Sequence, residues 1–242
     1  MRNLAVEKSS RIKFIVLENK KFIIRQFEIS FSLLSKVDSE TDLDKLQLEQ
    51  NISFAKAMTF VDAILHGSII ITPSMLPFYE KTFCEFDNNF VLLPDTTDPT
   101  LISVIQKKLT AIVGETCEVN SILLYDLDDH LKYSLDIFEQ DEEDDDLPNI
   151  KDFLGEFHLT DIPWWNRADE TTWDGAAKNQ EEYDAIKNTI QETEETEATL
   201  FEDIEESIRA VYKNAENTGE IIEVDFTEEH KHKKKKWKPT VI

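Results

Sequence analysis

The alternation of apolar and polar positions near the start of the chain predicts a β-hairpin. Residues 11–18 (RIKFIVLE) are rich in β-branched and aromatic side chains. Residues 22–34 resume the pattern, with apolar side chains at Phe27, Ile29 and Phe31, every second position. A period of two places such side chains on one face of a strand. The polar stretch at 19–21 is typical of the turn between two strands.

Two later segments have the spacing of amphipathic helices, and the first covers residues 51–65. Its apolar side chains recur three or four positions apart, at Phe54, Met58, Val61 and Leu65. We expect Asn51 to cap the start of this helix and Gly67 to end it in a left-handed conformation. Residues 36–49 are polar and acidic, and we expect a loop there, with one helical turn as the alternative.

The second predicted helix begins at Asp98, as the capping residue, and has Pro99 at its first helical position. We expect it to end at Gly114. Its apolar side chains all fall on one face: Leu101, Val104, Ile105, Leu109 and Ile112.

Short apolar runs complete the predicted domain. They indicate strands at residues 68–72, 90–93, 119–125 and 131–138. The resulting order is two strands, a helix, two strands, a helix and two strands, which is typical of the α+β class. We expect a small mixed or antiparallel sheet covered on one face by both helices, in a globular domain of residues 1–138.

The character of the chain changes at an acidic run, residues 139–146, in which seven of the eight residues are carboxylates. We divide the rest of the chain into an acidic linker (139–147), an acidic extension with helical and extended segments (148–229) and a basic tail (230–242). The formal net charge is −24, and residues 1–137 carry only −6 of the total. A surface this acidic is repelled by nucleic acid and anionic lipid and suits a basic partner. The run itself is interpreted as a solvated linker, with contact to a basic protein surface as the alternative.

The tryptophans of the extension leave two alternatives open. Trp164, Trp165 and Trp173 lie close together in an acidic stretch. Tryptophan is enriched among the residues that contribute most to protein–protein binding, so these rings are candidate partner-binding residues. The alternative is that they pack back onto the N-terminal domain and tether the extension.

A predicted helix near residue 200 presents a second set of candidate partner-binding residues. Its apolar stripe consists of Leu200, Ile204, Ile208 and Val211. Such a stripe on an otherwise anionic helix needs a surface on which to pack, and we expect that surface to belong to another chain.

The basic tail supplies the last candidates, Lys234 and Trp237. We expect the tail to contact an acidic segment of this protein or of a partner. Nucleic acid is the alternative here, and the tail is the one place in the chain where we consider it.

The segment from Asp126 to His130 most resembles a metal site, because three carboxylates and one imidazole fall within five residues. The spacing of a calcium-binding loop is absent, and aspartate is common in turns, where it accepts hydrogen bonds from the backbone. We therefore expect a hairpin turn. Phosphate-binding loops, nucleophile elbows and metalloprotease helices are absent from the sequence, so we expect no enzyme, no cofactor and no catalytic or metal-binding residues.

Function is predicted from composition and arrangement. Cys84 and Cys117 fit reduced thiols in the cytoplasm, with a single disulfide as the alternative. No apolar run is long enough to span a membrane. Low glycine with abundant Asp, Glu, Asn and Lys is common among phage-encoded proteins. The sequence predicts a non-enzymatic protein-interaction or assembly subunit, in the cytoplasm or in a phage virion as a structural protein. The alternatives are an acidic nucleic-acid mimic that inhibits a host DNA- or RNA-binding protein, and a metal-dependent enzyme centred on Asp126 and His130.

Overall fold

The computed structural model describes residues 5–36, 43–83, 90–114, 116–136, 147–192 and 199–218. These residues form one six-stranded sheet with the strand order β4-β3-β1-β2-β5-β6. The strands are β1 (Ala5–Glu18), β2 (Lys21–Ser35), β3 (Ile69–Ile71), β4 (Phe90–Leu92), β5 (Cys117–Asp126) and β6 (Lys132–Asp136). The pairs β1–β3 and β3–β4 are parallel and the other neighbours are antiparallel. The predicted α+β class and the predicted mixed sheet are therefore confirmed.

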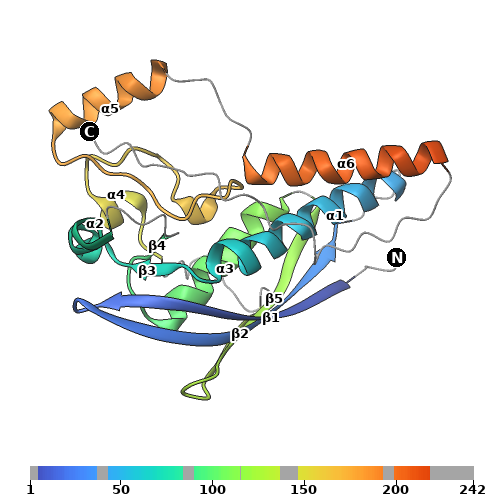
Figure 1. The fold of residues 1–242 in the computed structure, drawn as a ribbon, viewed down its shortest axis with the longest axis horizontal. Helices are drawn as coiled ribbons and strands as arrows, with labels where there is room; N and C mark the ends of the chain where they lie inside the picture. The colour runs from blue at the N-terminus through green and yellow to red at the C-terminus, as the bar shows by residue number, and fades with distance from the viewer. Residues whose placement is uncertain are drawn as a thin grey trace.

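β1 and β2 form the long hairpin that the alternation predicted (Figure 1). Asn19 and Lys20 join them with φ angles of 50° and 60°. Positive φ at both central residues marks the tight turn whose twist matches a hairpin. This turn sets the register of both strands, and Phe14 and Phe27 consequently stack in the core with ring centroids 5.3 Å apart.

The first helix begins earlier than predicted. α1 (Leu43–Thr59) continues into a π-helical turn, η1 (Phe60–Leu65), and Gly67 follows with the expected positive φ of 79°. Residues 43–50 (LDKLQLEQ) are mostly strong helix formers, so the loop interpretation there was wrong. Asn51 lies inside the helix, where its side-chain amide donates to the hydroxyl of Tyr212 and caps nothing.

The second helix, α3 (Asp98–Val113), agrees with the prediction except at its cap. Its five predicted apolar side chains are all buried, and it ends at Gly114 with a φ of 62°. The capping residue is Thr97, whose hydroxyl accepts from the backbone N–H of Thr100. The capping position therefore falls one residue earlier than we predicted, and the carboxylate of Asp98 binds the guanidinium of Arg25 at 3.0 Å instead.

Figure 1 shows α1 and α3 on the same side of β1 and β2, as predicted. Most buried side chains of the two central strands point to this side and include Ile12, Phe14, Phe27, Ile29 and Phe31, whereas the buried Leu17 points to the other side. The opposite face of β2 and β5 is polar, and the hydroxyls of Ser32 and Ser121 lie 2.8 Å apart on it. This face of the central strands therefore packs into the core, whereas β3 is buried at all three of its residues and so on both faces.

The remaining elements are short, apart from the last two helices. They are η2 (Pro73–Met75), α2 (Leu76–Phe83), α4 (Ile150–Leu154), η4 (Trp164–Asn166), α5 (Gln180–Glu192) and α6 (Leu200–Thr218). α6 lies along α1 (Figure 1), and the hydrophobic core of the sheet and helices extends to side chains of α4, η4 and α6. None of the described helices is long and apolar enough to cross a bilayer. The domain boundary at residue 138 stays a prediction.

Candidate interaction surface

The paired tryptophans of the extension are buried within the chain. Trp164 and Trp165 are each 1% exposed and meet edge to face, with ring centroids 5.8 Å apart. The indole N–H of Trp164 donates to the backbone carbonyl of Leu92 at the end of β4 (2.8 Å). Buried indole N–H groups need such a partner. Contacts within one chain thus account for the burial of both rings, which is one of the two alternatives that the sequence left open.

Lys108 of α3 holds this part of the extension in place. Its ammonium group is fully buried and donates to the carbonyls of Trp164 (3.0 Å) and Arg167 (2.9 Å) and to the carboxylate of Asp169 (3.3 Å). All three of its protons therefore have acceptors. Burial lowers the pKa of Lys108 to about 8, against the opposing charge of Asp169.

A buried carboxylate supports the same contact from inside the extension. Asp174 is 3% exposed and accepts from the backbone N–H of Trp164 (2.9 Å) and the hydroxyl of Thr160 (3.1 Å). Arg167 forms an ion pair with it at 3.2 Å. Burial nevertheless raises the pKa of Asp174. This network positions the loop around η4 on α3.

The third tryptophan lies where the extension covers the outer edge of the sheet. The backbone N–H of Leu92 donates to the carbonyl of Thr172 (2.9 Å), and the hydroxyl of Thr172 donates to the carbonyl of Phe90 (2.6 Å). Trp173 is half-buried, with its ring centroid 5.6 Å from that of Phe90. The edge of β4 is thereby protected from pairing with another strand.

The predicted stripe of α6 exists and packs on α1 of the same chain. Ile204 and Ile208 are buried, whereas Leu200 and Val211 are half-buried. Lys56 of α1 forms an ion pair with Glu205 at 2.8 Å beside the stripe. The contact with another chain that we expected for this stripe stays a prediction, and Lys234 and Trp237 lie outside the described residues.

The segment after β5 is a tight turn. Asp126 is fully buried and accepts from the backbone N–H groups of Asp128 (2.7 Å) and Asp129 (3.0 Å), and its other oxygen binds Arg25. His130 lies 3.1 Å from the hydroxyl of Tyr125. These bonds occupy both oxygens of the one buried carboxylate, and in the described part of the chain no three His, Cys, Asp or Glu side chains are grouped as a metal site requires.

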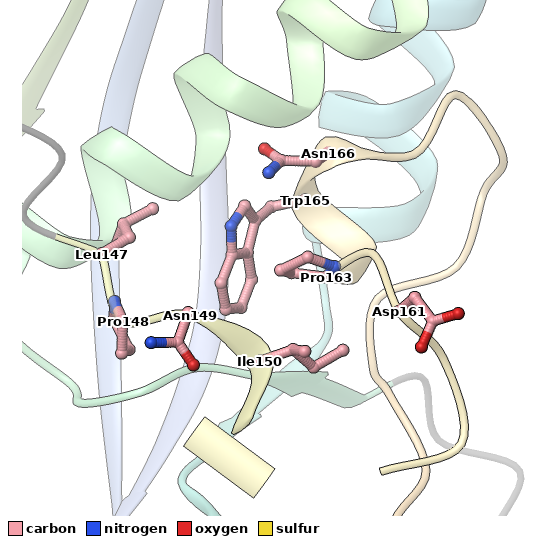
Figure 2. Close-up of a pocket in the computed structure, with 8 residues that line it drawn as sticks. All are labelled: Leu147, Pro148, Asn149, Ile150, Asp161, Pro163, Trp165 and Asn166. Atoms are coloured by element: carbon pink, nitrogen blue, oxygen red, sulfur yellow. The ribbon is translucent and has the colours of Figure 1, made fainter. Parts of the chain in front are cut away.

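A surface pocket of about 250 Å³ lies beside Trp165 (Figure 2). Its walls come from the start of α4 and the loop before η4, and include Leu147, Ile150 and Pro163. Figure 2 shows the indole of Trp165 between these apolar side chains and α3. The amide of Asn149 in its wall is already bonded to Asp152 of α4. Asp161 is the one ionisable residue among the described residues that line the pocket, and its carboxylate lies 3.8 Å from the imidazole of His158.

The far end of the β1–β2 hairpin, residues 18–25, is mostly exposed and carries three apolar side chains in a row, and we call it the hairpin end. Phe22, Ile23 and Ile24 are 45%, 42% and 55% exposed. Consecutive strand residues point to opposite faces, so apolar side chains are partly exposed on both faces of β2 here, although their cross-strand neighbours in β1, Val16 and Leu17, are buried. Among the described residues the other large exposed hydrophobic side chains are separate from one another, at Val6, Leu131 and Ile162.

Charge and backbone conformation distinguish the hairpin end further. Lys20 has a left-handed backbone, which costs a residue other than glycine roughly 1–2 kcal/mol. Lys20 and Lys21 are both exposed, and neither has an ion pair among the described contacts. Our sequence interpretation missed this surface because it considered the alternation at Phe27, Ile29 and Phe31 and not the three apolar residues before it. The break in alternation at Phe22, Ile23 and Ile24 was the available signal, because a one-sided strand does not carry three apolar residues in a row.

No protein-family model and no curated protein matches the chain. Among solved structures it is similar to an uncharacterized protein, WS1659, from Wolinella succinogenes, at 12% sequence identity and a TM-score of 0.34. The similarity covers 57% of this chain and 99% of that chain. A similarity of this degree carries no argument about fold or function.

Proposed function

We propose that this chain is a non-enzymatic protein-interaction subunit and that the hairpin end is its contact surface. The observation that carries the proposal is the run of three consecutive exposed hydrophobic side chains, Phe22 to Ile24, on both faces of a strand. Isolated exposed hydrophobic residues are normal on proteins, whereas contiguous ones mark interaction sites.

The exposed area is large enough to contribute to binding. Complete burial of an aliphatic or aromatic side chain contributes about 1.5–3 kcal/mol. About half of each of the three side chains is still exposed, so covering them contributes roughly 2–4 kcal/mol. This is enough to change an equilibrium by one to three orders of magnitude, although the ordering of both partners opposes it.

The larger role follows from composition and stays a proposal. A subunit that exposes an apolar contact surface and carries a strongly acidic remainder fits an assembly of several proteins. The composition led us to expect a phage virion, which is one such assembly. For an assembly of any other kind, the cytoplasm is the compartment that we propose.

The test is the mass of the native complex. The full chain is purified under mild conditions from the cells that encode it, and its mass is measured by size-exclusion chromatography with light scattering. We expect a complex larger than the monomer for the natural chain and a monomer for the variant with Ile23→Asp and Ile24→Asp. Ile162→Asp is the matched control, since Ile162 is 54% exposed and lies elsewhere.

Two results would contradict the proposal. The first is a complex that survives the double substitution, and the second is a complex that Ile162→Asp weakens equally. Circular dichroism must show the same thermal transition for all three chains, since exposed substitutions change stability little.

The nucleic-acid mimic is a second candidate because α6 holds carboxylates on a fixed surface. Its buried side is anchored on α1, and Glu202, Asp203 and Glu206 are exposed on its outer side. A mimic needs such rigid spacing to imitate phosphates. Reversing these three charges to lysine would abolish binding to a basic DNA- or RNA-binding protein and leave binding through the hairpin end intact.

A further inference from the structure

The pocket beside Trp165 contains a buried polar group that has no partner. Trp165 is 1% exposed and lines the pocket. The indole N–H of Trp164 donates to Leu92, whereas that of Trp165 donates to no acceptor within the described part of the chain. Figure 2 shows the indole nitrogen of Trp165 on the side that faces Leu147, another lining residue. Buried indole N–H groups need an acceptor, so the pocket fits a ligand that brings one.

The size of the pocket fits one large side chain. Its volume is about 250 Å³, whereas pockets for ligands of drug size are about 300–1,000 Å³. A cavity of about 150 Å³ in another protein holds benzene, so this pocket is sufficient for the two fused rings of an indole. Leu147, Ile150 and Pro163 supply apolar walls, and Asn166 is an exposed lining residue. The amide of Asn166 can donate to and accept from a peptide backbone, which favours an aromatic side chain carried by a peptide segment.

The charge around the pocket is negative. Residues 147–166 supply every described lining residue, and their charged or titratable side chains are Asp152, Glu156, Asp161, Lys151 and His158. α3, on which η4 packs, adds Lys107, whereas its Lys108 is already bound to Asp169. In the sequence, the acidic run of residues 139–146, with seven carboxylates, directly precedes Leu147. Acidic side chains outnumber basic ones even with Lys107 counted, so a basic segment fits this pocket better than an acidic one.

The chain itself contains a segment with both properties. Two stretches after α6 carry large apolar side chains, and the first, residues 221–226 (IIEVDF), includes two carboxylates. The second is the basic tail, in which Trp237 lies between Lys236 and Lys238. We infer that the pocket beside Trp165 binds the indole of Trp237 from the basic tail of the same chain. A backbone carbonyl of the tail accepts from the indole N–H of Trp165, and the lysines next to Trp237 approach Asp161.

The tail is long enough to reach the pocket within one chain. α6 has 19 residues and is therefore about 28 Å long, and the N–H of its first residue donates to the carboxylate of Glu170 (3.1 Å). Glu170 follows the lining residue Asn166 by four positions, a span of at most about 15 Å. With the length of the glutamate side chain added, Thr218 lies at most about 50 Å from the pocket. The chain from Thr218 to Trp237 spans up to about 63–68 Å.

The tail of a second copy would make the same contacts but is at a disadvantage. A segment joined to its site by a flexible linker binds at an effective concentration of about millimolar. At lower protein concentrations the tail of the same chain therefore occupies the pocket first. This contact is separate from the hairpin end, so the inference does not rest on the function proposed above.

Nuclear magnetic resonance of the indole N–H groups in the full chain tests the contact. The chain has four tryptophans and therefore four such signals. We expect Trp237→Ala to shift the signal of Trp165 and to speed the exchange of its indole proton with water by about tenfold or more, because the acceptor is lost. Phe226→Ala is the matched control. It removes an aromatic side chain from the acidic stretch after α6 and should leave the signal of Trp165 unchanged.

A synthetic peptide of residues 231–242 provides a second measurement. Added to the Trp237→Ala chain, it should restore the signal of Trp165, whereas the same peptide with alanine in place of tryptophan should not. Asp161→Asn should weaken the binding of the peptide about two- to fivefold, because it removes one exposed charge at the pocket. Asp62→Asn, an exposed change on η1, is the matched control and should not weaken it.

Several outcomes would overturn the inference. If Trp237→Ala and Phe226→Ala both leave the signal of Trp165 unchanged, or if the two peptides act alike, the pocket does not bind Trp237. Equal weakening by Asp161→Asn and Asp62→Asn would show that the overall charge attracts the tail and that the pocket does not. Protection of Trp165 that grows with protein concentration would identify the tail of a second copy as the occupant. All of these results are independent of the complex proposed for the hairpin end.

Discussion

A chain shortened to end at Asp136 should not fold cooperatively, although it contains all six strands and both central helices. The hydrophobic core includes six large buried side chains that come from beyond this point: Phe153, Trp164, Trp165, Phe201, Ile204 and Ile208. They cover α1, α3 and β4. Shortening the chain exposes the apolar surfaces of these three elements to water.

The expected loss is comparable to the whole stability of a domain. Burial of each large side chain contributes about 1.5–3 kcal/mol, which gives roughly 9–18 kcal/mol for six. The surfaces they cover are similar in area, so exposing those surfaces costs a similar amount at most. The free energy of unfolding of an ordinary domain is about 5–15 kcal/mol. The shortened chain lacks the extension and therefore also lacks the entropy cost of ordering it. That saving does not replace the contacts that α1, α3 and β4 have lost.

Urea denaturation followed by circular dichroism is the assay, and a chain ending at Thr218 is the matched control. We expect one sharp transition for the full chain and for the control. We expect a shallow change with a reduced slope for the chain ending at Asp136, because the slope follows the surface exposed on unfolding. A cooperative transition within about 2 kcal/mol of the full chain would refute the reasoning and would support a domain boundary at residue 138.

Two further predictions concern the core. Val61→Ala should lower the free energy of unfolding by about 1.5–3 kcal/mol, because Val61 is fully buried. Met58→Ala should lower it less, because Met58 is only partly buried. Equal losses in urea denaturation would place the two side chains in similar surroundings. In the folded state the pKa of Lys108 is lowered from 10.5 to about 8. Between pH 8 and pH 10.5 the unfolded chain therefore binds more protons than the folded chain. The stability of the natural chain relative to the Lys108→Met variant should rise across that pH range. A difference in thermal midpoint that is independent of pH from 7 to 10 would show that burial does not shift this group.

Local patterns along the chain were sufficient for the secondary structure of the first half. The hairpin and α3 could be predicted because a period of two and a period of three to four depend only on which face of each element is buried. The glycines that end the first two helices could be predicted because positive φ is a local requirement. The exceptions, Asn51 and Asp98, have partners distant in sequence, Tyr212 and Arg25, that compete for the side chain of the expected cap.

Only the tertiary structure decided where the extension lies. Trp164 and Ile204 are apolar residues in an acidic stretch, and the pattern shows that each needs a buried surface without showing which surface. In the sequence, Lys108 resembles an ordinary exposed lysine. Its ammonium group can be buried because the backbone carbonyls of Trp164 and Arg167, in a loop far away in sequence, accept its protons. The exposure of Ile24 likewise depends on where β5 ends. Sequence determines which segments must be buried and at what period, whereas their partners depend on contacts between residues far apart along the chain.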